Sequence, residues 1–159
     1  MAEGKEHYYA VEVRWTGNLG EGTKSYQSYA RTYDIISGPK PMISGSSDPA
    51  FRGNQDRWNP EDLMVAAVSA CHKLWYLHLC AVAGVNVVAY VDRAQGVMIE
   101  NDKRGGYFTG VTLRPEVTVT ADSDTAKAAA LHHDAHEKCF IANSVNCPIR
   151  CEPSIKRQT

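Results

Sequence analysis

Residues 59–84 read NPEDLMVAAVSACHKLWYLHLCAVAG and contain the clearest helix-forming stretch of the chain. Asn59 is a preferred N-cap residue, and Pro60 suits the first helical position because that position needs no N–H donor. Carboxylates fill the first turn, where the positive end of the helix dipole stabilises them. Gly84 suits the position that ends a helix. The pattern predicts a helix over residues 60–83.

The predicted helix is apolar on almost every side. Its apolar run is nearly long enough to span a bilayer, but His72, Lys73 and His78 in its middle argue against a membrane span. We therefore expect a central helix that is buried on most sides. A chain of 159 residues is too short to bury the whole apolar surface of such a helix. We therefore expect a second copy of the chain to bury the rest of it in a homodimer.

The rest of the chain predicts strands on both sides of this helix and one further helix. A long loop punctuated by glycine and proline precedes the first helix, and Pro115 predicts an edge position or a bulge in its strand. The expected elements are strands at 8–15, 25–36 and, short, 40–44, a hairpin with arms 85–100 and 107–120, a helix at 124–139 and a last short strand. The order βββαββαβ predicts an α+β fold in a single domain over residues 1–159.

Composition and charge narrow the function classes. Hydrophobic residues make up 43% and charged residues 22%, which is typical of a globular chain rather than a disordered one. The formal net charge of −1 argues against a nucleic-acid binder. The opening residues lack the pattern of a secretory signal, so we expect a cytoplasmic protein with no membrane partner.

The five cysteines are an odd number, which argues against a structural disulfide framework and for free, metal-bound or redox-active thiols. Cys71 stands midway along the predicted helix, where the helix dipole no longer stabilises a thiolate. A cation from another element would have to do so, and Arg31 and Arg52 are the candidates. Trp75 lies one turn beyond Cys71 and is the aromatic residue expected nearest to it.

The segment LHHDAHEKC at 131–139 offers a second interpretation. His132 and His136 are spaced i,i+4 on one face of the second predicted helix, and Cys147 and Cys151 would complete four zinc ligands. Surface histidines without a metal show the same spacing. The sequence leaves both interpretations open.

Two motifs resemble those of the OsmC/Ohr family of thiol-dependent organic hydroperoxide reductases. The segment NPEDLMVAAVSAC at 59–71 matches the family's first cysteine helix, with Glu61 ten residues before Cys71, and AHEKC at 135–139 matches the second. The likeness extends to the expected order of elements. It implies an OsmC-like α+β fold with antiparallel sheets wrapped around two long central helices in an intertwined dimer. Each active site would lie at the subunit interface.

The resemblance also implies roles. Cys71 matches the cysteine that attacks the peroxide and Cys139 the one that resolves it, although Phe140 follows Cys139 where the family often has proline. Glu61 matches the acid that pairs with an active-site arginine, for which Arg31 is preferred over Arg52. A straight helix separates Glu61 from Cys71 by about 15 Å. Glu61 would therefore join the site through an arginine lying along the helix, a helix distortion or a neighbouring chain.

The expected function is the reduction of organic hydroperoxides to alcohols through Cys71 and Cys139, with an external dithiol as reductant. This chemistry requires neither a metal nor an organic cofactor. The alternative is a non-catalytic thiol or zinc-binding protein on the same fold, acting as a sensor or an interaction module.

Overall fold

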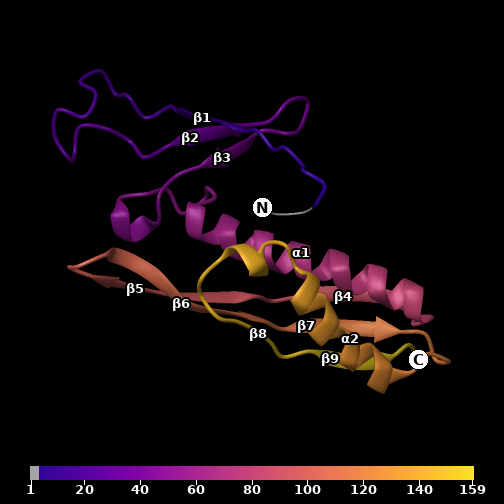
Figure 1. Cartoon of the computed structure of the whole chain (residues 1–159). Helices are drawn as coiled ribbons and strands as arrows, with labels where there is room; N and C mark the ends of the chain where they lie inside the picture. The colour runs from indigo at the N-terminus through magenta and orange to yellow at the C-terminus, as the bar shows by residue number, and fades with distance from the viewer. Residues whose placement is uncertain (1–3) are drawn as a thin grey trace. The chain divides into compact units, whose positions relative to one another are not determined.

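The computed structural model describes residues 4–159, which form two compact units divided between Leu63 and Met64. The first unit holds a three-stranded antiparallel sheet in the order β1-β2-β3 (Figure 1). Its elements are β1 (Glu12–Trp15), β2 (Tyr33–Ile36), β3 (Ile43–Gly45) and the short 3-10 helix η1 (Pro49–Phe51). The sequence-based expectation of a single domain over residues 1–159 stays a prediction, because the described residues divide into two compact units.

The first two strands are shorter than the sequence predicts, at four residues each. For β2, part of the difference comes from the turn before the strand, where side chains bond to the backbone in place of a neighbouring strand. The Asn18 carboxamide accepts hydrogen bonds from the N–H groups of Gly20 and Gly22, and the Ser28 hydroxyl donates to the carbonyl of Gly22. The alternating apolar residues of β1 are exposed, and Val13 is 62% exposed.

Helix α1 (Pro60–Ala83) has the limits that the sequence predicts. The Asn59 side chain accepts the Asp62 N–H at 2.8 Å, and Gly84 takes a φ of +74° after the last turn. Burial differs from the prediction, because within one chain only one stripe of the helix is buried. That stripe consists of Val68, His72, Tyr76 and Cys80, spaced four residues apart. By length and composition alone, α1 is the one helix of residues 4–159 that could cross a membrane.

The predicted hairpin divides each of its arms between two sheets, ordered β4-β7-β9 and β5-β6-β8. The Asp92 carboxylate accepts the Arg114 N–H at 2.7 Å where the arms pass from one sheet to the other. Pro115 begins the central strand β7, so the predicted edge position is wrong. The strands are β4 (Val87–Asp92), β5 (Gln95–Asn101), β6 (Gly105–Leu113), β7 (Pro115–Val119), β8 (Ile149–Cys151) and β9 (Ser154–Arg157).

The last two strands pair in parallel, β8 with β6 and β9 with β7, so both sheets are mixed. Four strands lie between α1 and α2 and two strands follow α2, whereas the sequence predicts two strands between the helices and one after them. The α+β class is confirmed.

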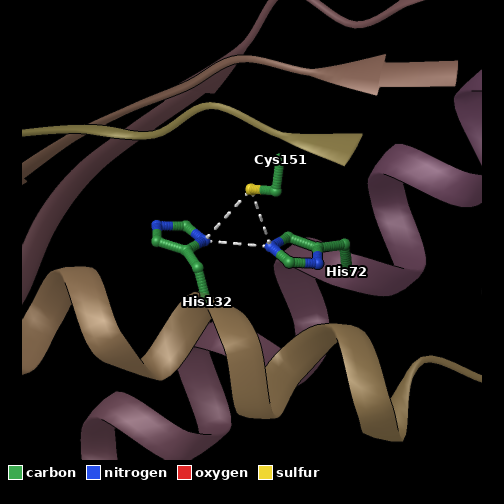
Figure 2. A group of neighbouring side chains, drawn as sticks. All are labelled: His72, His132 and Cys151. Carbon is green, nitrogen blue, oxygen red and sulfur yellow. Dashed lines mark hydrogen bonds between the residues drawn. The ribbon is translucent and has the colours of Figure 1, made fainter. Parts of the chain in front are cut away.

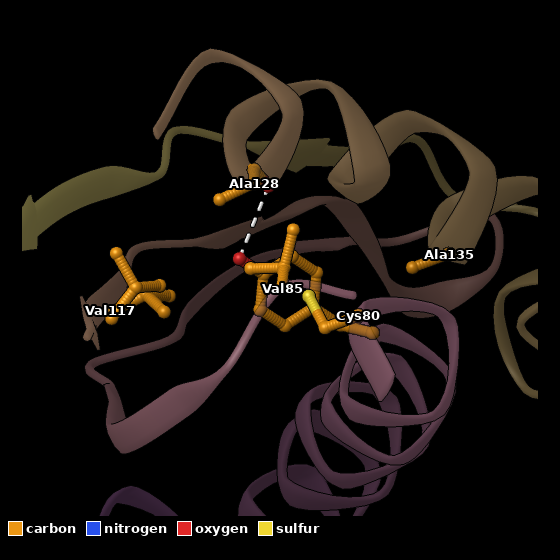
Figure 3. Packing of buried hydrophobic residues seen from close by; sticks show 7 residues of the cluster. Cys80, Val85, Val117, Ala128 and Ala135 are labelled. Carbon is orange, nitrogen blue, oxygen red and sulfur yellow. Dashed lines mark hydrogen bonds between the residues drawn. The ribbon is translucent and has the colours of Figure 1, made fainter. Parts of the chain in front are cut away.

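Helix α2 (Thr125–Lys138) begins after Asp124, whose carboxylate accepts the N–H groups of the second and third helical residues at 2.9 and 3.0 Å. Small residues let α2 pack closely on the core (Figure 3). The Tyr76 hydroxyl donates to the Ala128 carbonyl at 3.1 Å within this core. The buried cluster consists of Tyr76, Cys80, Val85, Val117, Val119, Ala128 and Ala135. These contacts fix how the buried face of α1 meets α2.

Candidate active site

Cys71 and Cys139 lie side by side in the second unit. Cys71 is partly exposed in the middle of α1, whereas Cys139 is fully buried at the C-terminal end of α2. Cys71 lies close enough to Cys139 to raise the pKa of the Cys139 thiol. Both cysteines are reduced. The structure thus brings together the two cysteines that the sequence singles out.

The two thiols have different surroundings. Burial raises the pKa of Cys139, the Ala142 N–H bonded to its sulfur at 3.4 Å opposes this shift, and the neighbouring Cys71 adds to it. Ala142 begins the short 3-10 helix η2 (Ala142–Ser144), which follows α2 directly. Cys139 is therefore a neutral thiol at neutral pH, while Cys71 is the thiol that solvent and small molecules reach.

Trp75 extends the site along α1. Its ring lies edge-on to that of Phe140, with centroids 5.4 Å apart, so the face of α1 that carries Cys71 meets the segment after Cys139. Leu74, Trp75 and His78 line a recess of about 240 Å³ in the surface. An apolar surface is therefore available within one turn of Cys71, as the spacing predicts.

The two candidate arginines lie in the first unit, both near Tyr26. Arg31 donates to the carbonyls of Tyr26 and Tyr29, each at 2.6 Å, and its guanidinium stacks over both rings at 4.4 and 4.0 Å. Arg52 follows η1 with a φ of +64° and lies 5.8 Å from the Tyr26 ring. These contacts fix the Arg31 guanidinium while leaving some of its five N–H donors free.

Glu61 occupies the first turn of α1, also in the first unit. Burial raises the pKa of Tyr33, and the charge of Glu61 raises it further. No ion pair joins Glu61 to Arg31 or Arg52 in the described part of the chain. The predicted pairing of Glu61 with Arg31 or Arg52 is thus not formed among residues 4–159.

A second cluster lies beside the cysteine pair, since His72 follows Cys71 directly. His72 Nε2 is 2.9 Å from His132 Nδ1, and Cys151 Sγ is 3.7 and 3.8 Å from these two nitrogens (Figure 2). Both imidazoles are buried. Burial lowers the pKa of both, with the charge of His72 lowering that of His132 further, so both rings are neutral at neutral pH.

This cluster corrects the predicted zinc set. His132 and Cys151 do come together, but His72 joins them, and neither His136 nor Cys147 belongs to the group found among residues 4–159. His72 was missed as a ligand candidate. Its place in the four-residue spacing of the buried stripe, between Val68 and Tyr76, was the available signal.

The sequence matches the family model described as OsmC-like protein over residues 53–154. The chain belongs to the OsmC-like family. An OsmC-like protein of unknown function from Vibrio cholerae is 30% identical, with a TM-score of 0.85, and the match covers 94% of this chain and all of that one. The predicted family and the OsmC-like fold are confirmed.

More distant solved structures share the OsmC-like fold. An organic hydroperoxide resistance protein from Legionella pneumophila is 17% identical, with a TM-score of 0.67, over 95% of this chain and 99% of that one. The organic hydroperoxide resistance protein OhrB of Bacillus subtilis is 21% identical, with a TM-score of 0.61, over 93% and 98%. No curated protein matches the sequence.

Proposed function

We propose that this OsmC-like protein reduces organic hydroperoxides to alcohols with Cys71 and Cys139. The observation that carries the proposal is the proximity of the two cysteines, of which Cys71 is partly exposed and Cys139 is buried. Family membership supports it, since some structural neighbours are named for organic hydroperoxide resistance.

The two thiols suffice for the bond changes. The Cys71 thiol first loses its proton to solvent. The thiolate attacks the terminal peroxide oxygen, the O–O bond breaks, and the departing alkoxide takes a proton from solvent to give the alcohol. Cys71 is then a sulfenic acid. The sulfur of Cys139 attacks it, the S–O bond breaks, and the thiol proton leaves with the hydroxide as water. An external dithiol reduces the resulting disulfide and restores both thiols.

The surroundings of the two thiols set their order of reaction. Cys71 reacts first because a peroxide in solution reaches it, while the buried Cys139 with its raised pKa stays protonated. That retained proton is the one that the leaving hydroxide needs in the second step. Arg31 and Arg52 are the proposed sources of the cation that stabilises the Cys71 thiolate.

The apolar side chains beside Cys71 favour peroxides with an organic part. The recess lined by Leu74 and Trp75 accepts an alkyl group, and the exposed Phe140 ring extends that surface. Hydrogen peroxide gains nothing from burial of apolar surface. We therefore expect a preference for bulky organic hydroperoxides over hydrogen peroxide.

Peroxide consumption with an excess of dithiol tests the proposal. We expect the wild type to consume tert-butyl hydroperoxide catalytically and Cys71→Ser to fall to the uncatalysed rate. Cys139→Ser should consume about one equivalent and then slow, because it forms the sulfenic acid but cannot form the disulfide. Cys147→Ser is the matched control and should keep the wild-type rate. Equal consumption by the wild type and Cys71→Ser would overturn the proposal.

We further propose that the protein acts as a homodimer. In the single chain, Leu74 and Val82 of α1 are 63% and 74% exposed, which leaves an apolar face of the long helix uncovered. Soluble monomers rarely expose large apolar patches. Sedimentation at micromolar concentration should give about twice the mass of one chain. A monomer across the whole concentration range would contradict the dimer.

A further inference from the structure

Three possible ligand atoms from three separate elements lie close together in the second unit. Nε2 of His72 on α1, Nδ1 of His132 on α2 and Sγ of Cys151 on β8 lie within 4.8 Å of one another (Figure 2). We propose that these three side chains bind one zinc ion. The site is separate from the proposed redox pair, because it contains neither Cys71 nor Cys139.

The distances between the ligand atoms fit a zinc ion after a small adjustment. Tetrahedral zinc with ordinary bond lengths separates two nitrogen ligands by about 3.3 Å, and a nitrogen from a sulfur by about 3.6 Å. The sulfur of Cys151 already lies 3.7 and 3.8 Å from the two nitrogens. The nitrogens of His72 and His132, at 2.9 Å, must move apart by about 0.4 Å.

The rings must also turn slightly. In this structure the two imidazoles are nearly parallel, with 3° between their planes, centroids 5.2 Å apart and the ligand nitrogens facing each other. This is the geometry of an N–H···N hydrogen bond, in which one of the two nitrogens carries a proton. For zinc to bind, this hydrogen bond must break. Both rings must then turn so that the lone pairs of His72 Nε2 and His132 Nδ1 face a metal position shared with Cys151 Sγ.

The outer nitrogens accommodate the displaced ring proton. His72 Nδ1 and His132 Nε2 are buried and have no hydrogen-bond partner in the described part of the chain. Because no group donates to either atom, each ring can carry its proton there and present its inner nitrogen to the metal. Binding then shifts one proton within a ring and releases one proton from the Cys151 thiol.

The local charge suits a divalent cation. Zinc with one thiolate and two neutral imidazoles has a net charge of +1, and an anion nearby lowers the cost of burying it. Asp92 supplies that anion, because it bonds to Ser69, which lies one turn before His72 on α1. Its carboxylate is held by the Ser69 hydroxyl at 2.5 Å and the Arg114 N–H at 2.7 Å.

The choice of zinc follows from the donor atoms. Two imidazole nitrogens and a thiolate favour zinc over calcium or magnesium, which prefer oxygen ligands. Three protein ligands leave the fourth tetrahedral position open. The Tyr90 hydroxyl is buried without a partner among residues 4–159.

Zinc titration of the reduced, metal-stripped protein, made without a polyhistidine tag, tests the site. The wild type should take up one equivalent in competition with a chromophoric chelator. His132→Ala and Cys151→Ser should bind more than about 100-fold more weakly, because each lacks a ligand. His133→Ala and Cys147→Ser are matched controls on the same elements or close to them. His133 is exposed and pairs with Glu137. Cys147 lies outside the ligand group found among residues 4–159, so both controls should bind like the wild type.

Cobalt substitution identifies the sulfur ligand. The wild-type cobalt form should show a thiolate-to-metal charge-transfer band that Cys151→Ser loses and that Cys71→Ser and Cys139→Ser keep. The site is refuted if the wild type takes up no stoichiometric zinc, or if Cys71→Ser loses the band and Cys151→Ser keeps it. The wild-type cobalt spectrum decides even if Cys151→Ser does not fold, since the absence of any thiolate band contradicts the assignment. No peroxide enters these assays, so their outcome is separate from that of the proposed reductase activity.

Discussion

Cys71 and His72 are consecutive residues that serve two different clusters. Successive residues of a helix point about 100° apart, so Cys71 meets Cys139 while His72 meets His132 and Cys151. The cysteine pair has one partly exposed member, whereas both imidazoles of the second cluster are buried. The contrast shows that consecutive positions of one helix supply a partly exposed thiol and, beside it, a buried imidazole.

The two clusters also differ in their attachment to the core. His132 stacks on the Tyr76 ring, with centroids 3.8 Å apart and 8° between the planes, and Tyr76 belongs to the buried core cluster. Cys139 instead lies at the end of α2 and bonds to the backbone of the segment that follows it. Substitutions in the histidine cluster should therefore affect folding most, and substitutions in the cysteine pair should affect chemistry most.

The largest stability effect is expected for His132→Ala in metal-free protein. The change removes a buried ring, leaves a cavity against Tyr76 and deprives His72 of its hydrogen-bond partner, which together cost about 3 kcal/mol. Urea unfolding measures the effect, and His133→Ala, one exposed position along the helix, should change stability by less than about 0.5 kcal/mol. Equal losses for both variants would contradict the burial contrast.

A smaller loss is expected for Tyr76→Phe. Its hydroxyl donates to the Ala128 carbonyl inside the core, and removal of one buried hydrogen bond costs about 1–2 kcal/mol. Tyr90→Phe provides the comparison, because that buried hydroxyl has no partner in the described residues and its removal should leave metal-free stability unchanged or slightly higher. Thermal or urea unfolding of both variants checks the pair. Destabilisation by Tyr90→Phe would show that its hydroxyl has a partner.

The smallest loss is expected at the start of α2, far along the helix from Cys139. Asp124→Ala removes two hydrogen bonds to the first turn and should cost about 1 kcal/mol. Asp134→Ala, exposed in the middle of the same helix, should cost less because alanine is the better helix former there. A cost at Asp134 that exceeds the cost at Asp124 would contradict the capping role.

The helices could be predicted from the sequence because their ends depend on local chemistry. Asn59 and Asp124 cap α1 and α2 through their own side chains, and Gly84 supplies the left-handed turn after α1. The burial of α1 was overestimated, because composition shows that a face is apolar but not what covers it. Leu74 and Val82 remain exposed in the single chain.

Strand limits depend on pairing between distant segments, which local patterns do not record. Residues 25–28 resemble a strand but form a turn, in which the Ser28 hydroxyl accepts the Ser25 N–H and donates to the Gly22 carbonyl. The hairpin arms look continuous in the sequence, yet both divide between two sheets where Asp92 bonds to Arg114.

The candidate site was only partly accessible from the sequence. The expectation that Cys139 lies near Cys71 rests on the resemblance to a family. Periodicity alone does not predict that residues on two different helices come into contact. His72 was missed because its partners, His132 and Cys151, are distant in the sequence and only the folded chain brings them together.

Disulfide mapping after oxidation tests the central claim most directly. The reduced protein is treated with one equivalent of an organic hydroperoxide, blocked at its free thiols and digested for mass spectrometry. A two-cysteine mechanism predicts a peptide that joins Cys71 to Cys139, with Cys147 and Cys151 still free. A bond from Cys71 to Cys147 or Cys151, or a lasting Cys71 sulfenic acid with Cys139 reduced, would contradict the assignment of the resolving thiol.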